Sequence, residues 1–208
     1  MIAVAFLAEI EADPSPAVWK ERLSRALEGL ARHHGRAMLM PVAAADRFPE
    51  CAGVLADLTP AYPMARALAE VFYPIPVRAA AAWGEVILAS DTPDADPLDA
   101  PAFLSAAELL YRVRKEDRLL LVQGESPPVD RLQNALALLL HREMSRWTER
   151  QCEIVRRYRE TGRQEAVARE LGVSQQAVSG SLVAAGWPAL LEAEAALLEV
   201  CSRSARRP

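Results

Sequence analysis

The chain has 208 residues, of which 51% are hydrophobic, and its formal net charge is −4. This hydrophobic fraction is sufficient for a packed core, which argues against wholesale disorder, and the negative charge argues against a protein coated in positive potential. Its three widely spaced cysteines fit no disulfide framework or zinc site, and no apolar run approaches the roughly 18 residues of a membrane span, so we expect a cytoplasmic protein with no membrane partner.

Residues 1–145 alternate between short apolar runs and amphipathic segments. Strands are predicted at 1–7, 37–42 and 118–123, with a hairpin of two further strands, 77–83 and 85–89, that turns at Gly84. Helices are predicted at 15–33, 62–72, 103–115 and 129–144. This order predicts an α+β domain over 1–145, with a small mixed sheet of four or five strands and helices on one of its faces.

Residues 146–208 are predicted to form an all-α domain, and no glycine- or serine-rich linker precedes it, so we expect the two domains to be rigidly coupled. Thr148 and Gln151 match a capping box, which opens a helix that stops at Gly162. From Arg146 onward, ten arginines against eight glutamates give +2, whereas fourteen basic and twenty acidic residues before it give −6. The basic end therefore coincides with this helical domain, as nucleic-acid binding requires.

The segment 164–182 has the residue spacing of a helix-turn-helix. Ala168 is small where two helices must approach closely, and Gly172 lies where the tight turn needs a positive φ. Ser174 is placed to cap a new helix, from which Val178 faces back toward Ala168. Three short helices with a glycine turn between the last two place a recognition helix in the DNA major groove, and the alternative is a small three-helix bundle that binds protein.

The recognition helix is predicted to bury Ala177, Val178, Leu182 and Ala185. Its outward residues would reach base edges, and a glutamine amide suits the N6 and N7 of adenine. The candidate DNA-contacting residues are Arg163, Arg169, Ser174, Gln175, Gln176, Ser179 and Gly180. Further candidates for phosphate contacts are Arg156, Arg157 and Arg159, for which a solvated helix face is the alternative. Gly180 costs a helix interior about 1 kcal/mol relative to alanine, so either the DNA comes very close there or the reading surface has weakened.

A last helix is predicted after Trp187-Pro188, with an apolar stripe. The stripe consists of Leu190, Leu191, Leu197, Leu198 and Cys201. It either packs on the helix-turn-helix or, because the leucines keep heptad spacing, forms the seam of a homodimer. One helix-turn-helix reads few base pairs, so useful specificity on double-stranded DNA implies a dimer.

The order of these segments resembles the SatD family of bacterial proteins over nearly the whole chain. The resemblance is strongest in WTERQCEIVRRYRETGRQEAVARELGVSQQAVSGSL, residues 147–182, and in VRAAAAWGEV, residues 77–86. It implies that 1–145 has a ferredoxin-like fold similar to the palm of class III nucleotidyl cyclases, and that the protein is a DNA-binding transcriptional regulator. The palm motifs depart from the family pattern: Gly-Asp-Ile is replaced by Ala8-Glu9-Ile10, and Gly-Asp-Glu-Phe-Gln by Ala45-Asp46-Arg47-Phe48-Pro49.

A working palm needs neighbouring carboxylates to hold a divalent metal against triphosphate oxygens. The candidate ligand or metal residues are Glu9 and Asp46, on adjacent strands, and Glu85 on a third element. Arg47 places a positive charge beside Asp46, so we expect a degenerate palm that dimerises or senses a ligand, with neither enzymatic activity nor a required cofactor. The alternatives are a nucleotide-binding or nucleotide-processing protein recruited to DNA by its helix-turn-helix, and an adaptor whose helical domain binds protein.

Overall fold

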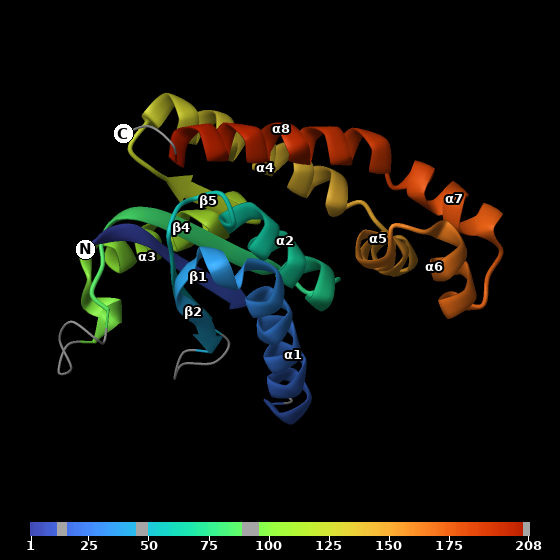
Figure 1. The fold of residues 1–208 in the computed structure, drawn as a ribbon, viewed down its shortest axis with the longest axis horizontal. Coiled ribbons are helices and arrows are strands. Elements are labelled where there is room, and N and C mark those ends of the chain that lie inside the picture. The colour runs from blue at the N-terminus through green and yellow to red at the C-terminus, as the bar shows by residue number, and fades with distance from the viewer. Residues whose placement is uncertain (12–15, 45–49, 89–95, 206–208) are drawn as a thin grey trace.

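The computed structural model describes residues 1–11, 16–44, 50–88 and 96–205 (Figure 1). Five strands form one mixed sheet in the order β2-β3-β1-β4-β5. Neighbouring strands are antiparallel except β4 and β5, which are parallel. The strands are β1 (Ile2–Ile10), β2 (Met38–Ala44), β3 (Glu50–Leu55), β4 (Val77–Glu85) and β5 (Leu120–Gln123). The predicted α+β class is confirmed.

Helices cover both faces of the sheet, so the prediction of helices on one face was wrong. Helices α1 (Pro16–His34), α2 (Ala61–Phe72) and α4 (Pro127–Met144) contribute to the larger core, and α3 (Pro101–Glu116) packs on the other face. The side chains of β1 alternate between the two cores, as a strand period of two requires. Those facing α3 are mostly alanine, which lets this helix lie close to the sheet.

Two glycines lie within strands of the sheet, and one of them, Gly53, lies where two segments approach too closely for a side chain. The predicted hairpin at Gly84 was wrong, because β4 continues through it, and a Cβ there would lie 3.4 Å from the Cβ of Ala102 in α3. Strand β3, which was not predicted, contains Gly53, where a Cβ would lie 2.6 Å from Val42 Cγ2 and 2.9 Å from Val42 Cα. Neither glycine reverses the chain, and packing requires a glycine at Gly53.

Both edges of the sheet are protected against pairing with a further strand. On β5, the side chain of Asn134 accepts a hydrogen bond from the Val122 amide (2.8 Å) and donates one to its carbonyl oxygen (2.9 Å). On β2, Pro41 has no amide hydrogen to offer. Such features disfavour association through sheet edges.

Three short helices follow the sheet: α5 (Glu149–Thr161), α6 (Gln164–Leu171) and α7 (Gln175–Ala184). The chain then returns in α8 (Trp187–Ala205), which runs along α4 (Figure 1). The larger core continues from the sheet through α4, past the predicted boundary at Ser145, into these helices. Among the described residues, no single helix is long and apolar enough to cross a membrane.

The apolar stripe of α8 packs mainly against α4, and not chiefly on the three preceding helices as one interpretation expected. Leu190, Leu197 and Cys201 are buried in the larger core, whereas Leu191 is half exposed. The heptad pair Leu190 and Leu197 is therefore buried within the chain and is not available to form a dimer seam.

Candidate functional site

The helices α5, α6 and α7 begin and end at residues whose local chemistry was readable from the sequence. The capping box is confirmed: Thr148 Oγ1 accepts from the Gln151 amide (3.1 Å), and Gln151 Oε1 accepts from the Thr148 amide (2.8 Å). Gly162, with a φ of 66°, ends α5 in the left-handed region. These caps satisfy backbone groups that a helix end leaves without partners.

The turn between α6 and α7 has the predicted geometry. Gly172 ends α6 with a φ of 65°, and its amide donates to the Ala168 carbonyl. Ser174 Oγ accepts from the Ala177 amide (3.2 Å) and caps α7. Ala168, Val178 and Leu182 are buried together in the core. The two helices are thus joined by a short turn around a small apolar contact.

One face of α7 is open to solvent and uncharged. The residues exposed on it are Gln175, Gln176, Ala177, Gly180, Val183 and Ala184, with Ser179 half-buried beside them. The prediction that Ala177 is buried was wrong. The buried face of α7 consists of Val178, Leu182 and Ala185, which are spaced three or four residues apart, and Ala177 lies outside this face. We call the surface formed by the exposed residues the α7 face.

A shallow, open depression of about 370 Å³ adjoins the N-terminal end of the α7 face. It is lined by Tyr158 and Gly162 at the end of α5, Arg163, Gln164 and Glu165 at the start of α6, and Gln175 of α7. The structure therefore brings two of the predicted contact residues, Arg163 and Gln175, to one place.

Most arginines near this surface are already paired. Arg157 lies 2.7 Å from Glu170, Arg156 lies 4.0 Å from Glu160, and the exposed Arg163 lies 3.9 Å from Glu165. Among the described residues, Arg169 has no ion-pair partner, and it is exposed. The positive charge available for phosphate contacts is accordingly small.

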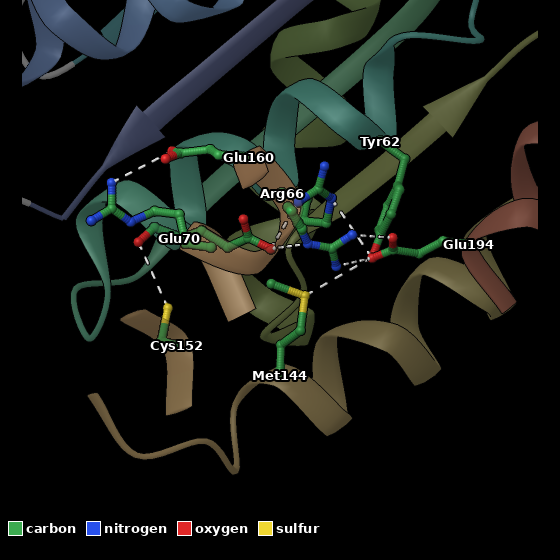
Figure 2. Close-up of polar contacts among 9 residues, drawn as sticks. Tyr62, Arg66, Glu70, Met144, Cys152, Glu160 and Glu194 are labelled. Carbon is green, nitrogen blue, oxygen red and sulfur yellow. Dashed lines mark hydrogen bonds and ion pairs between the residues drawn. The ribbon is translucent and has the colours of Figure 1, made fainter. Parts of the chain in front are cut away.

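Arg159, predicted to be a candidate for phosphate contact, instead lies largely buried at the junction of α2, α5 and α8. It contacts Glu70 at 2.9 Å and Glu194 at 2.6 and 2.7 Å. Arg66 completes the group, 2.8 Å from Glu70 and 3.7 Å from Glu194. We call Arg66, Glu70, Arg159 and Glu194 the ion cluster (Figure 2). Arg159 points inward because it lies on α5 near the face that carries the buried residues Cys152 and Val155.

Neighbouring groups complete the polar contacts of the ion cluster. The Tyr62 hydroxyl donates to Glu194 (3.3 Å), and burial together with this carboxylate raises the pKa of Tyr62 well above its usual value. Burial alone lowers the pKa of Arg66, but the carboxylates of Glu70 and Glu194 outweigh it, and the pKa is raised. The ion cluster pairs two arginines with two glutamates, so its formal charges balance.

The predicted ligand or metal residues do not come together. Glu9 lies opposite Arg78, whereas Glu85 lies opposite Ile2 at the other end of β1, seven residues or about 23 Å away along the strand. Asp46 lies outside the described residues. The separation of Glu9 from Glu85 arises because β4 is one straight strand and not a hairpin.

The carboxylate of Glu9 is paired with Arg114, a partner that the sequence did not predict. Arg114 Nε donates to Glu9 Oε1 at 2.6 Å, a second guanidinium nitrogen contacts Glu9 Oε2, and Glu50 lies 3.9 Å away. Within the part of the chain that the structure describes, no group of three or more histidine, cysteine or acidic side chains could hold a metal ion. The described residues at this end of the sheet fit an internal ion pair and do not fit a divalent metal.

The chain matches no protein-family model, no curated protein and no solved structure.

Proposed function

We propose that this protein binds double-stranded DNA sequence-specifically and acts as a cytoplasmic transcriptional regulator, with α6 and α7 as a helix-turn-helix. The α7 face carries the proposal. Its glutamines, Gln175 and Gln176, lie in the first turn of a capped helix and are exposed. Among the described residues, neither side chain has a hydrogen-bond partner. A helix of this kind enters the major groove with its first residues toward the base edges.

Gly180 supports close approach of a partner. A Cβ added there would meet nothing within 4 Å, and its φ is not positive, so neither packing nor backbone conformation requires glycine. A glycine inside a helix costs about 1 kcal/mol relative to alanine. On the α7 face, the missing side chain leaves room for a base edge or a sugar-phosphate chain.

The contacts divide into base readout and phosphate positioning. Gln175 or Gln176 would make paired hydrogen bonds to adenine, and Ser174 and Ser179 would reach a phosphate or a base. Arg163 and Arg169 would contact phosphates. With about two phosphate contacts per copy, the slope of log affinity against log salt for a dimer is about −4. Non-specific binding should accordingly be weak.

Residues 1–145 would form a degenerate palm-like domain that dimerises or senses a ligand, as the resemblance to the SatD family implies. The protected edges of the sheet indicate that such a homodimer would form through other surfaces. The contact of Arg114 with Glu9 disfavours the nucleotide-processing alternative, because the carboxylate is already neutralised.

A second candidate is an adaptor that binds protein through the α7 face. The observation that favours it is the uncharged character of this face, on which Val183 is 70% exposed. An apolar side chain of this size also suits contact with a thymine methyl group, so the two functions must be separated by experiment.

Binding of the full-length protein to pooled random duplexes, measured by fluorescence anisotropy across a salt series, tests the proposal. We expect affinity that falls with salt, and selection that enriches a repeated half-site. Gln176→Ala should weaken binding to the selected site, whereas Gln123→Ala, an exposed glutamine on β5, should not. Absence of binding even at low salt would exclude DNA as the partner. Magnesium-dependent triphosphate binding that Asp46→Ala abolishes would instead support the nucleotide-processing alternative.

A further inference from the structure

The ion cluster joins three elements through one side chain. Arg66 and Glu70 both belong to α2, which packs on the sheet, whereas Glu194 belongs to α8. Arg159 of α5 directs Nε to Glu70 and both terminal nitrogens to Glu194. A guanidinium is planar with donors in fixed directions, so three simultaneous contacts define its orientation as well as its position.

The burial of the ion cluster indicates a geometric role. The side chains of Glu70 and Glu194 are 4% and 9% exposed, and those of Arg159 and Arg66 are 14% and 16% exposed. At such depth, the cost of removing charges from water offsets much of their attraction, and apolar residues of similar volume often give equal stability. The cluster differs from an apolar contact in that it is satisfied in only one relative placement of α2, α5 and α8.

Contacts lead from the ion cluster to the α7 face. The guanidinium of Arg159 lies 4.6 Å from the ring centre of Trp187, against which Tyr158 packs edge-on at 5.6 Å. Tyr158 lines the depression that also contains Gln175. At the other end of α7, Trp147 Nε1 donates to the Ala185 carbonyl at 3.0 Å. Trp147 thus holds the C-terminal end of α7, and Arg159 packs against Trp187, which follows α7 directly in the chain.

We propose that Arg159 is a positioning residue that fixes the orientation of α7 relative to the sheet. It contacts no DNA itself. If the proposed function holds, this fixed orientation sets the distance between the two recognition helices of a dimer, and with it the half-site spacing that is selected.

Distances between spin labels test the orientation without reference to DNA. Nitroxide labels are placed on cysteines substituted for Glu108 of α3 and Val183 of α7, both exposed, and labelled protein is diluted with unlabelled protein so that only distances within one chain are measured. The three native cysteines are buried. We expect one narrow distance distribution in the parent and a broadened or shifted one in Arg159→Met. The control is Arg157→Met, in the same helix, whose partners Glu153 and Glu170 lie outside the ion cluster; it should match the parent.

An unchanged distribution in Arg159→Met would overturn the proposal. If Arg159→Met does not fold, Arg159→Lys decides by the same criterion, because lysine keeps the charge but has no planar fork with which to bridge two carboxylates. In DNA selection, Arg159→Met should lose the preference for one half-site spacing by about tenfold while keeping its affinity for a single half-site. If the protein without substitutions binds no DNA, the proposed function is excluded. The spin-label distances would still test whether Arg159 fixes the orientation of α7.

Discussion

At one end of the sheet, Glu9 and Glu50 face the guanidinium of Arg114, whereas on the α7 face, Gln175 and Gln176 have no partner among the described residues. The first region has its charges satisfied by the chain itself. The second leaves hydrogen-bonding groups and a glycine open on a helix with well-formed caps. A surface whose polar groups have no partner within the protein, and which does not contribute to the core, is the better candidate for binding another molecule. Substitutions should therefore cost stability in the satisfied regions and binding on the α7 face.

The largest loss of stability is expected in the ion cluster, which is satisfied in the same way as the end of the sheet. Glu194→Ala leaves the buried Arg159 with one carboxylate fewer, and should lower the free energy of unfolding by about 3 kcal/mol. Urea unfolding followed by circular dichroism measures it. Glu192→Ala, on the exposed side of the same helix, should change stability by less than about 0.5 kcal/mol. Equal effects of the two substitutions would show that the ion cluster is not a special element of the fold.

On the α7 face, Gln176→Ala should weaken base discrimination and leave stability nearly unchanged. Loss of a paired contact to adenine should reduce discrimination at one base pair by about 1–3 kcal/mol. The free energy of unfolding should stay within about 0.5 kcal/mol of the parent, because the side chain is exposed. Competition between the selected duplex and its single-base variants measures the first quantity. Discrimination that is unchanged in both Gln176→Ala and Gln175→Ala would remove the glutamines from base readout.

A smaller effect is expected from Arg114→Ala. It removes charged hydrogen bonds to Glu9, but Arg114 is itself nearly half exposed, so the loss of stability should be about 1 kcal/mol. DNA affinity should not change. Arg112→Ala, which breaks an exposed pair with Glu116 in the same helix, is the matched control and should be close to neutral. A loss of DNA affinity in Arg114→Ala alone would mean that the end of the sheet is not separate from the binding surface.

Local signals in the sequence predicted much of the C-terminal half. The caps at Thr148 and Ser174 and the turn at Gly172 depend on residues within four positions, and all three were correct. The ion pairs were not predictable in this way. Arg159 contacts Glu70, 89 positions away, and Glu194, 35 positions away, and Arg114 lies 105 positions from Glu9.

The errors in the sheet have a related cause. A glycine in an apolar run can mark a turn or lie within a continuous strand, and only the pairing of Gly84 with Ala3 of β1 shows that it is the second case. Strand β3 is short and rich in small residues, and its burial depends on β1 and β2 lying on either side of it.

The most direct test of whether DNA lies on the α7 face is Gly180→Ala, measured for both stability and DNA binding. The new methyl group enters open space in the free protein, so the free energy of unfolding should rise by about 1 kcal/mol. The same methyl group should obstruct the DNA and weaken binding to the selected duplex by about tenfold, or 1.4 kcal/mol. Gly29→Ala in α1, where an added Cβ also meets nothing within 4 Å, should raise stability similarly and leave binding unchanged. Gly180→Ala protein that binds the selected duplex as tightly as the parent would contradict the account, because the α7 face would then not be where the DNA lies.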